Sequence, residues 1–271
     1  MSTASQTTTT TSGYFSIDGL SIEYRKIEAT ERWAPTLVFL HEGLGSVGLW
    51  RDFPDRLCAA TGCGALIYSR QGHGSSTPLP RNAAGEIDPD AEYLKREADE
   101  MLPKVMDAAG IDRAILVGHS DGGSIALMMA ATNPHRVIGC IVEAPHVMVE
   151  EITVKGIRRA SRAYSSGDLR DGLAKYHKDP EGIFMRWYRT WTNPGFAAWN
   201  IYNRLPHIRC PILGIQGEED QYGSFSQLTT IRDSVAGPVE MQGLKRCGHT
   251  PHGEYPELVM ESILKFLPLC R

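Results

Sequence analysis

A serine between two glycines is the first feature that could do chemistry. Ser120 lies in "LVGHSDGGSIAL" (residues 116–127), within the pattern G-x-S-x-G. The apolar run 114–117 predicts a strand, and the spacing of residues 122–131 predicts a helix. A serine on such a strand-to-helix turn is typical of a catalytic nucleophile, and the alternative interpretation is a plain tight turn. Because its hydroxyl is almost never ionised at neutral pH, the serine needs a base and a group that orients the base.

The loop "CGHTPHGEYP" (residues 247–256) offers the base. We predict His249 for this role, because it follows the last predicted strand, precedes the last predicted helix and comes after both the serine and a suitable acid. His252 on the same loop is the alternative base. A third interpretation treats His249 as an ordinary surface histidine, since the chain has nine histidines.

The segment "QGEEDQYG" (residues 216–223) offers the acid. Asp220 stands three residues after Gly217, where a turn residue can point back over the edge of the sheet, and we predict that it orients the imidazole of the base. Glu218 and Glu219 are neighbouring alternatives that could instead be solvated loop charges. Glu143, at the end of the preceding predicted strand, is a further alternative orienter.

Acyl transfer also requires N–H donors for a developing oxyanion. We predict the backbone N–H of Asp121 as one donor, because it follows the nucleophile. The second should come from "HEGLGS" (residues 41–46), where Gly43 and Leu44 are equally good choices. His41 is a possible substrate contact, although we favour a role in bracing this loop.

Three further side chains are candidates for substrate contact. Glu42 places a carboxylate beside the predicted oxyanion, so we expect it to be turned away or paired, for example with Arg70 or Arg51. Trp187 and Trp191 belong to an aromatic stripe at helical spacing in "IFMRWYRTW" (residues 183–191). Such a stripe usually packs a helix onto a core, and part of it can line an apolar acyl or aryl pocket.

Strands and helices alternate around these residues. After a predicted hairpin at Asp18-Gly19, near-continuous apolar runs predict buried parallel strands with helices on both faces of the sheet; the runs are 36–40, 65–69, 114–118, 137–144, 211–217 and 239–244. Residues 94–105 have a helical face that Pro103 should kink, and 255–267 should form a closing helix.

The domain organisation follows from where this alternation starts and stops. Residues 1–12 are polar and of low complexity, which predicts a disordered tail. Residues 146–207 show three helical stretches and no strand, which predicts a helical cap inserted into one α/β core made of residues 13–145 and 208–271. The basic residues of the cap should lie on its exposed face, and the alternative is that they attract a carboxylate-bearing substrate; they are Lys155, Arg158, Arg159, Arg162 and Arg170.

Composition limits the classes of partner and location. A net charge of −4 and a sequence pI of about 6.1 argue against nucleic acid and acidic membranes, so we expect a small-molecule partner. The N-terminal residues do not resemble a secretory signal, and no long apolar segment follows, which predicts a cytoplasmic protein. The six scattered cysteines predict free thiols without a metal site, Cys247 being notable for its position near His249.

Five motifs in order, "HEGLGSVGLW", "YSRQGHGSS", "GHSDGGSIAL", "GIQGEEDQYG" and "CGHTPHGEYP", resemble the α/β-hydrolase superfamily from residue 13 onward. The resemblance implies an eight-stranded, mostly parallel sheet, a cap after the sixth strand, and a Ser-Asp-His triad without metal or organic cofactor. "GHGSS" and the histidine loop also look like the menaquinone-pathway synthase of this superfamily, a lyase.

These observations lead to one principal hypothesis and its rivals. We expect a serine hydrolase that cleaves a small-molecule carboxylic ester or related acyl bond through an acyl-enzyme intermediate. The alternatives are a carbon–carbon bond hydrolase or a synthase-like lyase using the same triad, and a ligand-sensing protein that keeps the triad without turnover. The sequence leaves the oligomeric state open.

Overall fold

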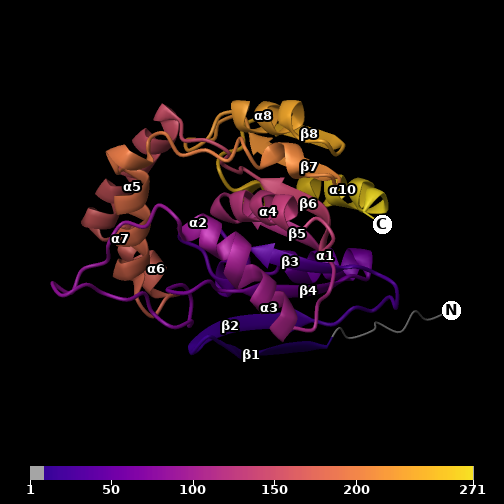
Figure 1. Ribbon diagram of the computed structural model, residues 1–271, viewed down its shortest axis with the longest axis horizontal. Helices are drawn as coiled ribbons and strands as arrows, with labels where there is room; N and C mark the ends of the chain where they lie inside the picture. The colour runs from indigo at the N-terminus through magenta and orange to yellow at the C-terminus, as the bar shows by residue number, and fades with distance from the viewer. Residues whose placement is uncertain (1–8, 271) are drawn as a thin grey trace.

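An eight-stranded sheet in the order β1-β2-β4-β3-β5-β6-β7-β8 runs through the molecule (Figure 1). The computed structural model describes residues 9–270. β1 pairs with β2 and β2 with β4 in antiparallel fashion, and every later pairing is parallel. The predicted α/β fold with a mostly parallel sheet is therefore confirmed. The strands are β1 (Thr10–Ile17), β2 (Leu20–Ile27), β3 (Thr36–Leu40), β4 (Gly64–Tyr68), β5 (Ala114–His119), β6 (Val137–Glu143), β7 (Ile212–Gly217) and β8 (Val239–Leu244).

The helices cover the two faces of this sheet and one of its ends. The α-helices are α1 (Phe53–Thr61), α2 (Tyr93–Arg96), α3 (Leu102–Ala108), α4 (Asp121–Thr132), α5 (Glu151–Ser166), α6 (Asp168–Ala174), α7 (Pro180–Trp191), α8 (Ser226–Ser234), α9 (Pro251–Glu254) and α10 (Pro256–Phe266). A π-helical turn, η2 (Glu97–Met101), joins α2 to α3. Short 3-10 turns complete the set: η1 (Val47–Trp50), η3 (Pro194–Phe196), η4 (Leu205–His207) and η5 (Leu267–Leu269).

Alternation along the central strands produces two hydrophobic cores. In β3, Val38 and Leu40 belong to the core shared with α3, α4 and α8, whereas Leu37 and Phe39 belong to the core shared with α1 and α10. Successive side chains of a strand point to opposite faces, so a strand buried on both faces must be apolar at every position. This requirement explains the unbroken apolar runs in the sequence.

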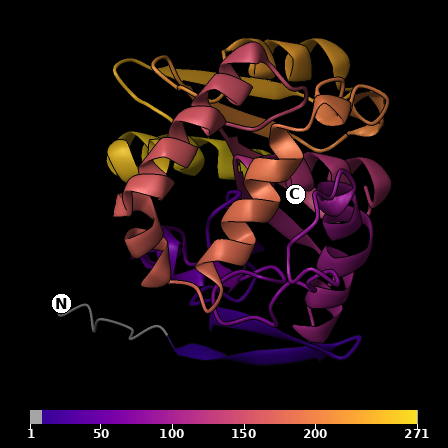
Figure 2. The same ribbon diagram turned by 90° about the vertical axis from the view of Figure 1, so that its left-hand side faces the viewer.

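Helices α5, α6 and α7, called here the inserted helices, lie between β6 and β7 in the chain. They stand beside the carboxyl end of the sheet, to the left in Figure 1 and in front in Figure 2. An isolated bridge between Met148 and Asn200 joins the two ends of the insertion. Helices therefore occupy the segment predicted as a cap, directly over the strand ends that carry the candidate site residues.

One local feature differs from expectation, and a second agrees with it. β1 begins at Thr10, where Thr10 pairs with Ile27, so the predicted boundary of a disordered tail at residue 12 was too late; residues 1–8 of that tail lie outside the described residues. The helix expected across residues 94–105 contains the π-turn directly before Leu102 and Pro103, consistent with a proline restarting the helix.

In the described part of the chain, no helix combines the length and apolar character needed to span a membrane.

Candidate active site

Ser120 occupies the turn between β5 and α4 in a strained conformation. Its backbone has φ 53° and ψ −115°, a left-handed region that a residue with a Cβ rarely adopts. Close packing enforces the turn, because a Cβ on Gly122 would lie 1.8 Å from the carbonyl oxygen of Leu40. The small residue lets α4 approach β3, and Ser120 is held above the end of the sheet.

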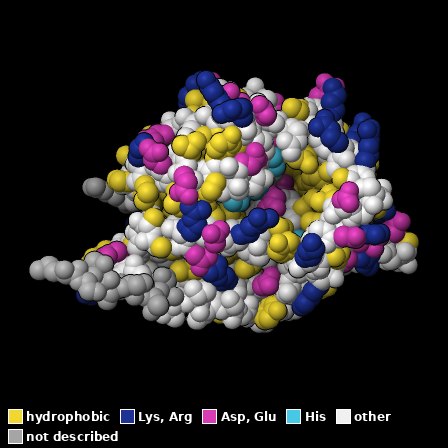
Figure 3. Space-filling model, turned by 180° about the vertical axis from the view of Figure 1, so that it is seen from behind, with side chains coloured by type: hydrophobic (Ala, Val, Ile, Leu, Met, Phe, Trp, Pro, Cys, Tyr) yellow, Lys and Arg dark blue, Asp and Glu magenta, His cyan; other side chains and the backbone are white. Residues whose placement is uncertain are grey.

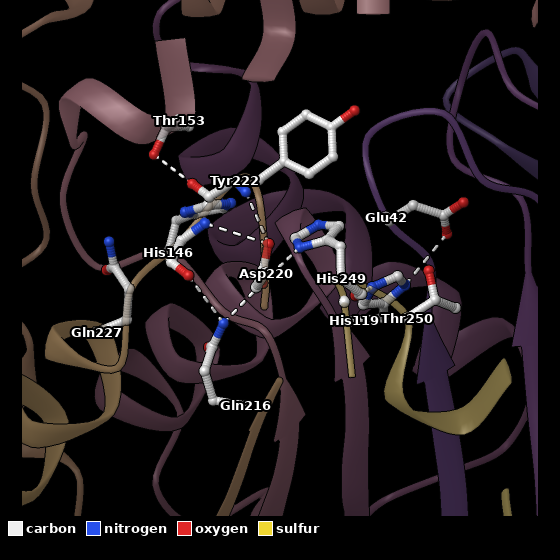
Figure 4. A network of polar contacts seen from close by, with 12 residues as sticks. Glu42, His119, His146, Thr153, Gln216, Asp220, Tyr222, Gln227, His249 and Thr250 are labelled. Carbon is white, nitrogen blue, oxygen red and sulfur yellow. Dashed lines mark hydrogen bonds and ion pairs between the residues drawn. The ribbon is translucent and has the colours of Figure 1, made fainter. Parts of the chain in front are cut away.

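His249 and Asp220 meet on the adjacent loops after β8 and β7. The Nδ1 of His249 lies 2.8 Å from Oδ2 of Asp220, which also accepts from Nε2 of Gln216 at 2.6 Å (Figure 4). The other oxygen of Asp220 accepts from the N–H groups of Tyr222 and Gly223. Burial alone would raise the pKa of Asp220, but its contacts with His249 and the Tyr222 N–H outweigh burial and lower that pKa. The carboxylate is therefore built to stay ionised beside the imidazole.

The alternative base and acids lie elsewhere. His252 is paired with Glu143 instead, its Nδ1 and its backbone N–H both 2.9 Å from Oε2 of that carboxylate. Glu218 and Glu219 are exposed on the loop before Asp220. The structure thus joins His249 to Asp220 and places His252 in a separate buried pair.

A cavity of about 360 Å³ brings these loops together under the inserted helices. Ser120 and His249 both line it, and no hydrogen bond joins their side chains within the part of the chain that the structure describes. Catalytic hydrogen bonds are often loose in structures without substrate. Figure 3 shows histidine and hydrophobic side chains around a hollow on the face turned away in Figure 1.

The wall of the cavity is mainly apolar. Its apolar members from the inserted helices are Ile157, Leu169, Leu173, Trp187 and Trp191. None of the described residues that line it is a lysine or arginine. The basic residues predicted for the outer face of the insertion, Lys155, Arg158, Arg159, Arg162 and Arg170, are exposed, as expected. The cavity therefore suits an uncharged, apolar group.

Three backbone N–H groups at the cavity wall have no hydrogen-bond acceptor among residues 9–270: those of Gly43, Leu44 and Asp121. The carbonyl of Glu42, in the same peptide unit as the Gly43 N–H, accepts from His41 Nδ1 (2.7 Å), Arg70 Nη2 (2.8 Å) and the Gly45 N–H (3.1 Å). The N–H and C=O of a trans peptide point in opposite directions, so the Gly43 N–H points away from the three groups that donate to the Glu42 carbonyl. Their hydrogen bonds also polarise the Gly43 N–H.

Two histidines that the sequence reasoning missed also hold this turn. His73 Nε2 lies 3.1 Å from the Gly43 carbonyl, and His177 Nε2 donates to the Leu44 carbonyl at 3.0 Å. His177 comes from the insertion and its Nδ1 accepts from the Gly74 N–H. "GHGSS" contained His73 as a visible signal, whereas nothing near His177 in the sequence pointed to this contact.

The predicted substrate contacts divide into two groups. Glu42, Trp187 and Trp191 line the cavity. His41 is fully buried and is absent from the lining among the described residues, so its prediction as a substrate contact was wrong and its bracing role fits better. Trp191 also donates from Nε1 to the hydroxyl of Tyr93 at 2.8 Å, which anchors α7 to the core.

Glu42 finds a partner that was not predicted. Its carboxylate lies 3.7 Å from Nδ1 of His119 (Figure 4). Arg70 donates instead to the backbone carbonyl of Glu42. Pairing of this carboxylate with an arginine was therefore the wrong expectation. A separate contact joins Arg70 to the buried Asp121 at 3.7 Å, and Tyr93 donates to Asp121 at 2.5 Å.

His146 is a further cavity residue without a sequence signal. Its ring lies 5.0 Å from that of Trp191 and 6.0 Å from that of His249. Burial, with a smaller contribution from the charge of His249, lowers its pKa to about 3. His146 therefore presents a neutral imidazole to the cavity at physiological pH.

No cysteine is among the described residues that line the cavity. All six cysteines are free thiols, and burial raises the pKa of Cys247 to about 12. Within residues 9–270, no group of three or more His, Cys, Asp or Glu side chains is arranged to hold a metal ion.

Comparison with known proteins identifies the family. Residues 37–262 match the model of the alpha/beta hydrolase family. The 2-succinyl-6-hydroxy-2,4-cyclohexadiene-1-carboxylate synthase of Salmonella agona is 23% identical over 270 residues, covering 87% of this chain and 95% of that protein.

Two solved structures show the same fold. The enol-lactonase from Burkholderia xenovorans LB400 superposes with a TM-score of 0.72 at 20% identity, over 94% of this chain and 99% of that one. Est816, described as an N-acyl homoserine lactone degrading enzyme, superposes with a TM-score of 0.68 at 25% identity, over 93% and 99%. Because the family model matches most of the chain, from β3 into α10, this chain belongs to the alpha/beta hydrolase family.

Proposed function

We propose that the protein is a serine hydrolase that cleaves an uncharged carboxylic ester, open-chain or cyclic, through an acyl-enzyme intermediate. The observation that carries this proposal is that one cavity is lined by Ser120, by His249 with Asp220 bonded to it, and by three backbone N–H groups that have no acceptor among the described residues. A nucleophile, an oriented base and oxyanion donors are the groups that acyl transfer requires.

In the proposed mechanism, Ser120 attacks the ester carbonyl and His249 accepts its proton. The N–H groups of Asp121 and Gly43, or of Asp121 and Leu44, stabilise the oxyanion of the tetrahedral intermediate. His249 then protonates the leaving alcohol and activates a water molecule that hydrolyses the acyl-enzyme. Asp220 keeps the imidazole in the required tautomer throughout.

The character of the cavity supports an uncharged substrate. The two acidic side chains in its wall each face a basic side chain, His119 for Glu42 and Arg70 for Asp121. With no lysine or arginine among the described lining residues, a substrate carboxylate would have no cationic partner there. This weighs against the second candidate, a lyase like the Salmonella synthase, whose name specifies a carboxylate product.

The proposal is tested with a fluorophosphonate and p-nitrophenyl esters of increasing chain length, with lactones as the cyclic series. We expect one covalent adduct in the intact-protein mass and ester turnover, both abolished in Ser120→Ala. Ser165→Ala, at an exposed serine of α5, is the matched control and should behave as wild type. Folded wild-type protein that forms no adduct and hydrolyses no ester would refute the proposal.

A further inference from the structure

Three loops of the site are joined by one side chain that does not line the substrate cavity in the described structure. His119 directly precedes Ser120, and its Nε2 lies 2.6 Å from the carbonyl oxygen of His249. Its Nδ1 faces Oε2 of Glu42 at 3.7 Å, and Glu42 directly precedes Gly43 (Figure 4). The imidazole of this neighbour of Ser120 thus contacts the backbone of His249 and the Glu42 side chain, next to the turn of Gly43 and Leu44, called here the oxyanion turn.

The geometry determines where the protons lie. A carbonyl oxygen can only accept, so at 2.6 Å Nε2 of His119 must donate to His249. The carboxylate of Glu42 faces the other nitrogen, which makes a second proton on the ring favourable. At 3.7 Å this contact is an ion pair and exceeds hydrogen-bond length. The ring is therefore placed to work as an imidazolium.

The carboxylate of Glu42 folds back over its own loop, close to the oxyanion turn. A Cβ on Gly45 would lie 2.2 Å from Oε2 of Glu42, so the carboxylate is folded over Gly45. Without a cation, this charge beside the Gly43 and Leu44 N–H groups would disfavour a developing oxyanion.

A second, more polar cavity gives the pair its own access to protons. This cavity, of about 440 Å³, is lined by Glu42, His119, Thr250 and His252 among others. Glu42, Leu49 and Thr250 line both cavities, so the pair lies at their boundary. His119 can therefore change its protonation state while substrate fills the apolar cavity.

We propose that Glu42 and His119 form a positioning ion pair that holds the oxyanion turn and the His249 loop in register for catalysis. The inference rests on the proposed ester hydrolysis. It adds that full turnover requires an intact Glu42–His119 pair. Titration or neutralisation of either partner lowers kcat, while KM depends on the apolar cavity.

The charged surroundings of His119 favour its protonated form. Burial alone would lower its pKa, but the Glu42 carboxylate, the charge of Glu143 and the His249 carbonyl outweigh burial and raise it. His119 in turn holds the pKa of Glu42 well below its usual range, against the effect of burial. The titratable groups facing the ring are Glu42, Glu143, His146, His249 and His252.

The sign of the pH effect follows. Since the pKa of His119 is raised above its ordinary value, the pair is complete below that pKa and is lost as the pH rises through it. Wild-type kcat should therefore fall on the alkaline side of that pKa. In Glu42→Gln this alkaline limb should move to lower pH, because the partner that raises the pKa of His119 is gone.

Two substitutions at His119 separate charge from hydrogen bonding. His119→Phe removes both the charge and the hydrogen bond to the His249 carbonyl. We expect kcat to fall at least about tenfold with KM unchanged, because a hydrogen bond to a charged group contributes a free energy of about that size. His119→Gln keeps an N–H donor for the His249 carbonyl, so it should retain more activity and lose the alkaline limb. The control is His135→Gln, at an exposed histidine.

NMR titration of the His119 imidazole tests the pairing without relying on turnover, and we expect its pKa to fall in Glu42→Gln. An unchanged pKa would overturn the inference, as would an unmoved alkaline limb, a kcat within about twofold in His119→Phe, or losses confined to KM. Wild-type protein that neither labels nor hydrolyses esters would instead defeat the proposed hydrolysis, whatever the titration shows.

Discussion

Replacing Asp220 by asparagine tests the arrangement of the site most directly. Oδ1 of Asp220 accepts from two backbone N–H groups, those of Tyr222 and Gly223, which cannot become acceptors. The amide oxygen of Asp220→Asn must therefore take this position, and its NH₂ group takes the position of Oδ2. That NH₂ faces Nδ1 of His249, 2.8 Å away in the native protein, and donates to it. The proton of the neutral imidazole is then forced onto Nε2.

The size of the effect follows from this tautomer. With Nε2 protonated, the side of His249 available to Ser120 has no lone pair and cannot accept the serine proton. Loss of the correct tautomer costs a serine triad about 10⁴-fold in kcat, which corresponds to about 5.5 kcal/mol of transition-state stabilisation. The fold should survive, because asparagine has nearly the volume of aspartate and its amide oxygen still accepts from the N–H groups of Tyr222 and Gly223.

The assay is turnover of a p-nitrophenyl ester, with the rate of fluorophosphonate labelling as an independent measure of nucleophile activation. Glu219→Gln is the matched control, since it removes a carboxylate one residue away and should keep wild-type kcat. A folded Asp220→Asn variant that stays within about tenfold of wild type would refute the reasoning, as would a Glu219→Gln variant with the larger defect.

Three other outcomes follow from the structure. Gly43→Ala should lower kcat/KM at least about tenfold, because its Cβ would lie 2.5 Å from Cδ1 of Trp187. Gly172→Ala is the control and should leave kcat/KM unchanged, because its Cβ would meet open space. Equal kinetics for the two variants would contradict this prediction. A thiol reagent should label Cys210 first in the native protein, because Cys210 is only partly buried and the neighbouring thiol of Cys140 lowers its pKa. Mass mapping that finds another cysteine labelled first would contradict this prediction. His146 should keep constant imidazole NMR shifts between about pH 5 and 8, because its pKa is about 3, and a titration within this range would show that burial does not keep it neutral.

Much of the fold was readable because burial on two faces leaves a strong pattern. The run 36–40 coincides with β3, and 137–144 and 211–217 match β6 and β7 to within one residue. The hairpin at Asp18-Gly19 was equally clear, because Asp-Gly favours a turn in which both residues have positive φ, and both do in the structure. The start of β1 was misjudged because pairing with β2, rather than local composition, orders Thr10.

The candidate site was predictable where chain order and local turn chemistry determine position. Ser120 could be placed from its glycines and flanking elements, and His249 and Asp220 from the loops after the last two strands. The partner of Glu42 could not, because Glu42 and His119 are far apart in sequence and meet only when β3 and β5 pair.

Sequence by itself determined the parallel sheet, the strand-to-helix turn at Ser120 and the order of the three triad candidates, because these depend on local periodicity and on the carboxyl ends of strands sharing one edge. Tertiary structure decided which acid faces which histidine: Asp220 joins His249, and Glu143 joins His252. It also decided that His119 meets Glu42, and that an apolar cavity without a lysine or arginine in its described lining lies above Ser120. These pairings are set by the packing of distant loops, for which neighbours in the sequence carry no signal.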